Sequence, residues 1–344
     1  MQVRLTQRGP LHAANGHLVE TGYATRLIKA YDRSRIKAPK WRIKEWDYYL
    51  IANDSFCLAL TVADNGYMGL DSISFIDLDA QTQATQTRMT AFPMGKRDLP
   101  PSSEGGRVAA QGKQYRMDFK VENGQRHLFG HMYDFLGPDQ PLLFDIVLTQ
   151  PPDDSIVMVT PFMNKPRAFY YNQKIPLMPA EGKVVLAGQE HLFSPASSFG
   201  TLDWGRGVWT YKNTWYWSSA SGIVDGHRFA LNLGYDFGDT SNATENMVFV
   251  DGVGYKLEDV VFDIPMKDGR EEFLSPWRVQ DNQGRLDLLF TPILDRASYT
   301  DFWLLGSDQH QVFGRFSGVV KPTPAMDIAV TNLTGFAEKV TNKW

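Results

Sequence analysis

The stretch Trp204-Gly-Arg-Gly-Val-Trp-Thr-Tyr-Lys-Asn-Thr-Trp-Tyr-Trp217, followed by Phe229-Ala-Leu-Asn-Leu-Gly-Tyr235, decides the fold. Its first part holds four tryptophans within 14 residues, among tyrosine and β-branched neighbours. Aromatic and β-branched residues are enriched in strands, and a turn with Gly222 and Gly226 separates the two parts. Tryptophans at this density must line a wall or a pocket, because their large apolar surface is costly to expose. The stretch predicts an all-β protein with an aromatic cavity.

The rest of the chain repeats short apolar runs separated by turn signals. In the first half, strands are expected at 46–51, 56–62, 69–76, 83–89, 115–121, 128–133, 142–149 and 156–162. In the second half, they are expected at 215–221, 228–235, 247–250, 260–264, 273–279, 286–290, 302–305 and 312–320. Within 116–121, apolar and polar residues alternate, which is typical of an antiparallel sheet with one wet face.

Residues 165–188 form the least regular stretch, with Pro166, Pro176 and Pro179, and are expected to connect two halves. About eight strands are expected on either side, and sheets of that size usually close or fold over because open edges invite aggregation. We therefore predict two antiparallel β-barrels or sandwiches packed together, formed by residues 1–185 and 186–344.

The composition is that of a soluble globular chain, with 344 residues, 43% of them hydrophobic and 22% charged. The net charge of −4 does not favour nucleic acid as a partner, since phosphate binding needs a clustered basic face. We find no signal peptide and no apolar run of about 20 residues, so no stable membrane insertion is expected. The single cysteine, Cys57, lies in an apolar strand, is expected to be a buried thiol and favours a cytoplasmic location. The oligomeric state stays open.

Several kinds of chemistry lose support. Motifs for nucleotide hydrolysis, dinucleotide redox chemistry, zinc proteolysis and esterase catalysis are absent, and no cofactor is expected. His127 and His131 resemble a metal pair, but four residues of strand span about 13 Å. Both ligands of one metal must lie about 2 Å from that metal. Two side chains this far apart on a strand cannot do so, and no metal site is expected.

The tryptophan cluster allows two interpretations. A period of two residues places Trp215, Trp217, Ser219 and Ser221 on one strand face, which tapers from large to small side chains. The indoles either fill the middle of a barrel or pave a cavity for a polyene, acyl chain or ring system. The sequence leaves both interpretations open.

Further candidate residues flank the indoles. The predicted ligand-binding residues are Arg206, Trp209, Tyr211, Lys212, Trp215, Trp217 and Asn232. Arg206 either packs across an indole to close a barrel or joins Tyr211 and Lys212 in a polar patch that grips a carboxylate or polarises a carbonyl. Asn232 shares its strand face with small residues, Ala230 and Gly234, which is how a strand makes room for a bound molecule.

Carboxylates follow this strand. Asp236 and Glu245 are either turn residues or candidate catalytic acids. As acids, they would protonate a ligand held by the tryptophans, whose π faces stabilise developing positive charge.

Three segments carry a family resemblance: Lys44-Glu-Trp-Asp-Tyr-Tyr49, the stretch from Trp204 to Gly222, and Asn232-Leu-Gly-Tyr-Asp-Phe-Gly-Asp239. These motifs resemble the bacterial DUF2804 family, from about Gly16 to the end of the chain. The second half is more distantly similar to lipocalin-like proteins of the AttH and carotenoid 1,2-hydratase group, which includes tocopherol cyclase and kievitone hydratase. The resemblance implies two lipocalin-like β-domains that bind an apolar molecule.

The sequence departs from that group at one point. Where its members have Asp-His-Glu, this chain has Tyr211-Lys212-Asn213. Tyrosine and lysine, with pKa values near 10, are poor acids for protonating an alkene. Hydratase or cyclase activity therefore does not follow directly from the resemblance.

Three functions remain. The first is binding of a hydrophobic small molecule, such as a lipid or isoprenoid, in an aromatic-lined barrel. The second is a hydratase, cyclase or isomerase that transfers a proton to such a ligand. The third is a structural or partner-binding protein with filled barrels. A desolvated carboxyl with a raised pKa facing the cavity would favour the second.

Overall fold

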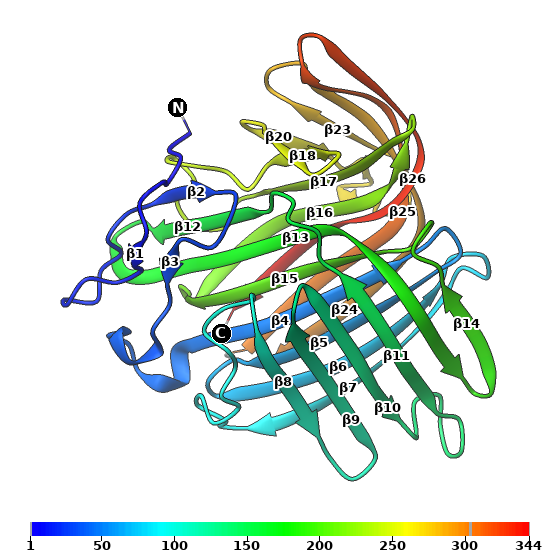
Figure 1. Ribbon diagram of the computed structural model, residues 1–344, viewed down its shortest axis with the longest axis horizontal. Coiled ribbons are helices and arrows are strands. Elements are labelled where there is room, and N and C mark those ends of the chain that lie inside the picture. The colour runs from blue at the N-terminus through cyan, green and yellow to red at the C-terminus, as the bar shows by residue number, and fades with distance from the viewer. Residues whose placement is uncertain (1, 303–304, 344) are drawn as a thin grey trace.

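The computed structural model describes residues 2–302 and 305–343, which fold almost entirely into β-strands (Figure 1). The described helices are two short 3₁₀ helices, η1 (Arg33–Arg35) and η2 (Lys40–Arg42). The predicted all-β class is confirmed. Among the described residues, no helix has the length and apolar character needed to cross a bilayer.

The first large sheet contains thirteen strands, all paired antiparallel. Ten of them follow one another in hydrogen-bonded order: β7 (Thr82–Ala91), β6 (Met68–Asp77), β5 (Phe56–Asp64), β4 (Ile43–Ala52), β15 (Phe199–Val208), β13 (Lys165–Leu186), β11 (Leu142–Thr149), β10 (Gln125–Met132), β9 (Tyr115–Glu122) and β8 (Gly106–Gln111). Three more strands attach to β13 or to one another: β12 (Ile156–Phe162), β14 (Gln189–Phe193) and β2 (Gly22–Ala24).

The second large sheet contains nine antiparallel strands. Their order is β19 (Val253–Lys256), β18 (Met247–Val250), β17 (His227–Tyr235), β16 (Lys212–Val224), β26 (Met326–Lys343), β25 (Leu305–Thr323), β24 (Leu286–Phe302), β23 (Trp277–Asp281) and β20 (Val260–Asp263). Two small sheets complete the fold: β1 (Gly9–Pro10) with β3 (Lys29–Ala30), and β21 (Met266–Lys267) with β22 (Arg270–Glu271).

Each large sheet curls until strands far apart in its order share a core. In the first sheet, Tyr49 of β4 meets Phe119 of β9 with ring centroids 5.2 Å apart. In the second sheet, Tyr235 of β17 meets Phe262 of β20 at 5.4 Å. The protein therefore consists of two curled half-barrels, which lie against one another (Figure 1).

The segment predicted to connect two halves is a strand instead. β13 runs through the centre of the first sheet from Lys165 to Leu186. The prediction is wrong because the prolines occupy positions that a strand tolerates. Pro166 is near the start of the strand, and Pro176 lies where the pairing with β15 shifts register, between Ile175 and Met178.

The two large sheets divide between β15 and β16. β15 ends at Val208 in the first sheet, and β16 begins at Lys212 in the second. The boundary predicted between residues 185 and 186 separates domains, whereas the division between β15 and β16 separates sheets. The domain boundary therefore stays a prediction.

Strand β16 turns its tryptophan face toward the first sheet. Trp217 packs edge-to-face on Tyr48 of β4, with ring centroids 5.9 Å apart. On the opposite face, Ala220 and Val224 belong to the core of the second sheet. The tryptophans therefore lie at the junction of the two sheets.

Candidate functional site

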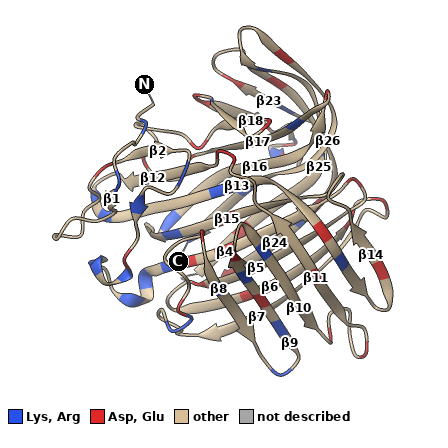
Figure 2. Cartoon of the chain, in the orientation of Figure 1, with Lys and Arg blue, Asp and Glu red and all other residues tan. Residues whose placement is uncertain are grey.

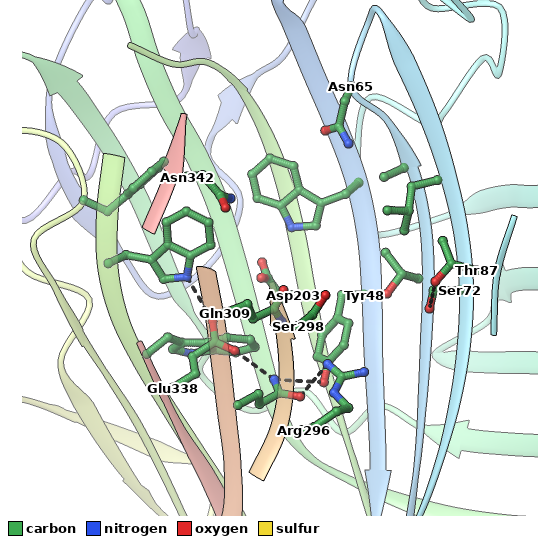
Figure 3. Close-up of a pocket in the computed structure, with 18 of the residues that line it drawn as sticks. Tyr48, Asn65, Ser72, Thr87, Asp203, Arg296, Ser298, Gln309, Glu338 and Asn342 are labelled. Atoms are coloured by element: carbon green, nitrogen blue, oxygen red, sulfur yellow. Dashed lines mark hydrogen bonds between the residues drawn. The ribbon is translucent and has the colours of Figure 1, made fainter. Parts of the chain in front are cut away.

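A cavity of about 550 Å³ lies at this junction. One side is formed by β4–β7, β13 and β15 of the first sheet, and the other by β16 and β24–β26 of the second (Figure 3). The sequence predicts a cavity within a barrel, whereas this cavity lies between the two sheets. The difference arises because the tryptophan face of β16 points away from the core of its own sheet.

Aromatic side chains form one part of the cavity wall: Trp46, Tyr170, Trp209, Trp215, Trp217 and Phe237. The ring of Phe237 lies 4.9 Å from Trp209, 5.4 Å from Trp215 and 4.8 Å from Tyr170, measured between centroids. These contacts are edge-to-face, the arrangement that the quadrupoles of aromatic rings favour. The rings hold one another in place and present a firm apolar surface to the cavity.

Glu338 of β26 places its carboxyl group against this aromatic surface. The residue is only 5% exposed and lines the cavity. Trp215 Nε1 donates a hydrogen bond to Oε1 at 2.9 Å, and Gln311 Nε2 donates one to Oε2 at 2.9 Å. Burial raises the pKa of Glu338 to about 7, and these hydrogen bonds and the charge of Arg296 offset the effect only in part. The Glu338 carboxyl therefore keeps its proton to a higher pH than an exposed glutamate does.

A buried lysine holds two more carboxylates beside the cavity. Lys174 Nζ lies 3.4 Å from Asp203 Oδ1 and 3.4 Å from Glu245 Oε2. It donates a hydrogen bond to the Tyr170 hydroxyl at 3.2 Å and lies 4.3 Å from the ring centroid of Trp217. Burial alone lowers the pKa of Lys174, but the two carboxylates raise that pKa more, to above its ordinary value. The lysine is therefore a permanent cation at this site.

Hydrogen bonds tie the acid to the first sheet. Arg296 of β24 donates to Ser74 Oγ of β6 at 2.6 Å and to Gln311 Oε1 at 2.6 Å. Gln311 in turn bonds Glu338 and approaches the Tyr48 hydroxyl at 3.5 Å (Figure 3). This network crosses the junction and fixes the two sheets relative to one another around the cavity.

The first sheet adds a row of hydroxyl groups. Tyr48, Thr61, Ser72 and Thr87 are cross-strand neighbours on β4 to β7, and all four line the cavity. The hydroxyl groups of Ser72 and Thr87 are 3.1 Å apart. The wall is therefore neutral and polar where the cavity extends toward the exposed strand β7.

Four of the predicted site residues lie on the cavity: Trp209, Trp215, Trp217 and Glu245. Asn232 lies behind them and joins two of them. Its Oδ1 accepts a hydrogen bond from Trp217 Nε1 at 2.8 Å, and its Nδ2 donates to Glu245 Oε2 at 3.2 Å. The space beside the small residue Gly234 holds the carboxylate of Glu245, so a side chain at Gly234 would displace that carboxylate.

Arg206 is fully buried within the first sheet and does not line the cavity. Its guanidinium donates to the carbonyl oxygens of Trp46 and Pro100, each at 2.7 Å, and to Asp47 at 3.2 Å. It also lies 4.3 Å from the ring centroid of Trp204. This geometry matches the interpretation of an arginine packed across an indole to close a barrel.

The other predicted residues are exposed and do not line the cavity: Tyr211, Lys212 and Asp236. Tyr211 lies just before β16, and Lys212 is the first residue of that strand. Asp236 follows β17 in the left-handed region, with φ of 68°, which is typical of a turn residue.

Sequence reasoning missed Glu338, Lys174, Asp203 and Arg296. Lys174 lies in residues 165–188, which the sequence predicts to be a connection and not a strand. Glu338 carries a usable signal, because period-2 spacing places it on one strand face between Phe336 and Val340, both fully buried. A carboxyl group between two apolar neighbours on one face indicates a buried acid.

The fold and the cavity define a lipocalin-like protein built from two half-barrels with an ionisable, aromatic-walled site between them. The chain belongs to the family described as Domain of unknown function (DUF2804), whose model matches residues 2–344. The resemblance noted from the sequence motifs is therefore confirmed. No curated protein shows significant sequence similarity to the chain.

Solved structures share the fold at low sequence identity. The chain is similar to a protein assigned as AttH from Nitrosomonas europaea, with 12% identity and a TM-score of 0.51, over 92% of this chain and 97% of that one. It is also similar to kievitone hydratase from Nectria haematococca, with 11% identity and a TM-score of 0.50, over 88% of each chain. Identities this low establish a common fold only.

Proposed function

We propose that the protein binds an apolar, unsaturated small molecule in the cavity between its sheets and transfers a proton from Glu338 to it. The observation that carries this proposal is the position of Glu338, a buried carboxyl group that faces a wall of aromatic rings. The pKa of about 7 for this carboxyl supports it, since an acid is most effective when its pKa lies near the working pH.

The first step would protonate a carbon–carbon double bond. The proton of Glu338 passes to one alkene carbon, and the positive charge develops on the other. The π faces of the surrounding tryptophans stabilise a cation, as they do in cation–π pairs. The Glu338 carboxylate left behind accepts the hydrogen bonds of Trp215 and Gln311 that are already in place.

The second step would remove the charge from carbon. Addition of water and loss of its proton gives a hydratase, attack by a hydroxyl group of the ligand gives a cyclase, and loss of a neighbouring proton gives an isomerase. Each route releases one proton, which replaces the proton that Glu338 donated in the first step. Asp203 and Glu245 are the candidate acceptors of that proton, because both line the cavity with carboxylate groups and lie beside the aromatic wall.

The shared fold adds support of a limited kind. One of the structural relatives is a hydratase by name, and the same two-sheet architecture in this chain surrounds a carboxyl group suited to proton transfer. The acid here is Glu338, whereas Tyr211-Lys212-Asn213 stands in the position of the acidic motif expected from the sequence resemblance.

A second candidate function is binding without turnover. Tyr211 and Lys212 are exposed and outside the cavity lining, so the segment that carries the acid in the resembling hydratases contributes no acid here. In that case the aromatic wall supplies affinity and Glu338 only orients the ligand.

Deuterium incorporation distinguishes the two functions. The protein is incubated in D₂O with geraniol, oleic acid or squalene, and carbon-bound deuterium is measured by mass spectrometry. All three reaction types begin with protonation of carbon, so one of these alkenes should acquire deuterium. Glu338→Gln should lower the rate at least about 100-fold while leaving fluorescence-detected binding in place. Binding without deuterium in the wild-type protein would favour the second candidate, and an undiminished rate in Glu338→Gln would reject Glu338 as the acid.

A further inference from the structure

Four large apolar side chains are exposed together at one edge of the first sheet. They are Trp41 in η2, Met89 near the end of β7, and Phe92 and Met94 in the following loop, with exposed fractions of 51%, 71%, 59% and 37%. We call these four residues the apolar rim. Single exposed apolar residues are ordinary, but a group of them marks a surface that binds something.

The backbone holds the rim together around one turn, Asn65 to Tyr67. Phe92 N donates to the Tyr67 carbonyl at 2.9 Å, and Met94 N donates to the Gly66 carbonyl at 3.0 Å. From the other side, the carbonyl of Trp41 approaches Gly66 so closely that a Cβ there would overlap it. The loop after β7 and the helix η2 are therefore neighbours, although about fifty residues separate them in the sequence.

Two of the rim residues are held in a strained conformation. Phe92 and Met94 have φ of 50° and 49°, in the left-handed region. Residues with bulky side chains rarely adopt this conformation, because it strains the backbone. Strain that keeps a phenylalanine and a methionine pointing into solvent does nothing for the core, so it points to a role for these side chains outside the molecule.

Basic side chains surround the rim. Residues 33–44 contain six lysines and arginines and no acidic residue, although the chain as a whole has a net charge of −4. The exposed bases are Arg35, Lys37, Lys40 and, in the loop, Lys96. Two exposed acids, Asp32 and Asp98, lie in the same segments. The four exposed bases outnumber them, so the patch has a net positive charge. Figure 2 shows the blue segments gathered at η1 and η2.

An apolar row leads from the rim into the cavity. Met89, Leu70, Ala63 and Trp46 are cross-strand neighbours on β7, β6, β5 and β4. The last three line the cavity, and Trp46 belongs to its aromatic wall. The row lies beside the row of hydroxyl groups on the same sheet face, so the cavity has a continuous apolar track to the rim.

We propose that the apolar rim and its basic flank form a docking surface for an anionic lipid bilayer, from which the apolar ligand reaches the cavity along the row ending at Trp46. The aromatic and methionine side chains would enter the interfacial region while the lysines contact anionic headgroups. Binding of this kind is reversible and needs no membrane-spanning segment. The path of the ligand rests on the proposed function, whereas the docking itself does not.

The test is flotation of the full-length protein with vesicles of phosphatidylcholine alone or mixed with phosphatidylglycerol. The wild-type protein should bind the mixed vesicles, and high salt should weaken binding because it screens the charges. Phe92→Asn combined with Met94→Asn replaces two apolar side chains with asparagine, which tolerates positive φ, so the fold should persist. We expect this variant to lose affinity at least about tenfold, given the transfer free energies of the two side chains. Lys37→Glu combined with Lys40→Glu should lower affinity by far more than tenfold, because each substitution changes the charge near the surface by two.

Matched controls lie away from the patch. Leu192→Gln removes an equally exposed apolar residue on β14, at the opposite end of the first sheet (Figure 1). Lys113→Glu combined with Lys267→Glu reverses two exposed charges elsewhere. Both variants should bind vesicles as the wild-type protein does, and so should Glu338→Gln, which separates docking from catalysis.

Three results would overturn the proposal. The first is no binding of the wild-type protein to mixed vesicles. The second is equal losses in the patch variants and their controls. The third is binding to mixed vesicles that depends on the lysines but is unchanged in Phe92→Asn with Met94→Asn, since this would assign the surface to a soluble polyanion and not to a bilayer.

Discussion

The indole nitrogen of Trp215 donates a hydrogen bond to Glu338, with Nε1 and Oε1 2.9 Å apart. Trp215 lies on β16 and Glu338 on β26, which pair antiparallel so that Glu338 stands opposite Trp217. Trp215 thus donates a hydrogen bond to Glu338, and Trp217, the next tryptophan of the same motif, is the cross-strand neighbour of Glu338. The aromatic wall and the acid are parts of one unit.

Trp215→Phe should raise the pKa of Glu338 above about 7. The indole N–H stabilises the charged carboxylate, and this bond is among the influences that lower the pKa of Glu338 against the effect of burial. Phenylalanine keeps the apolar contact and removes the donor. The measurement is the pH dependence of the carboxyl C=O stretch in difference infrared spectra, with Glu338→Gln identifying the band.

Trp217→Phe is the matched control, because its indole N–H bonds Asn232 and not Glu338. It should shift the titration of Glu338 much less than Trp215→Phe does. Equal shifts in both variants would mean that indole volume, rather than the hydrogen bond, sets this pKa.

The raised pKa of Glu338 predicts how stability depends on pH. Its value of about 7 in the folded protein exceeds the ordinary 4.5, so between these values the folded state holds more protons than the unfolded state. Stability from this group therefore falls as pH rises through that window, by about 3 kcal/mol in all. Two charged neighbours, Arg296 and Lys174, lower the pKa against the effect of burial.

Glu338→Gln isolates this effect, because glutamine does not titrate. The free energy of unfolding of the wild-type protein, from urea titrations, should fall relative to that of the variant between pH 4 and pH 8 by about 3 kcal/mol. A constant difference across this range would show that Glu338 titrates normally.

The fold was predictable from the sequence where alternation is regular. β9 shows this, since Met117 and Phe119 are buried while Arg116 and Lys120 are exposed. Strand β26 was not predicted, because its alternation changes phase. Ile328 and Val330 face the core before a register shift, and Leu333 and Ala337 face it afterwards. A bulge inserts one residue and reverses the pattern, so period-2 reasoning fails across it.

The site was predictable only in part. Its tryptophans form a local motif, whereas its ionisable groups come from strands far apart in sequence and meet only when the two sheets pack. The pair of Arg296 and Ser74, for instance, spans 222 positions. The exposed Asp236 follows the predicted strand but points to solvent, since no sequence pattern reveals which end of a strand borders a junction between sheets.

Cys57 should not react with thiol reagents in the native protein. It is 1% exposed, as the apolar strand around it predicted, and burial raises the pKa of its thiol well above the ordinary value. Labelling with a chromogenic disulfide should therefore require unfolding and should follow the unfolded fraction in urea. Fast labelling without denaturant would reveal local opening of β5.

Lys174→Met should destabilise the protein by about 3 kcal/mol, because it leaves two buried carboxylates without a cation. Lys174 is nearly fully buried, and Asp203 and Glu245 on either side are little exposed. Adding Glu245→Gln should restore part of the loss, because it removes one of the uncompensated charges. Urea unfolding of the single and double variants measures both effects.

The control for that change is Lys183→Met, which breaks a surface pair with Glu190 whose partners are about half exposed, Nζ to Oε2 2.6 Å. Exposed pairs contribute about 0–1 kcal/mol, so this variant should unfold almost as the wild-type protein does. The distance from lysine to carboxylate is longer at Lys174 than at Lys183. The loss of stability should nevertheless be larger for Lys174→Met, because desolvation rather than distance sets the cost of an unpaired charge. If both lysine variants lost the same small amount, water would have to reach Asp203 and Glu245 freely, and the junction between the sheets would be too wet to stabilise a neutral Glu338.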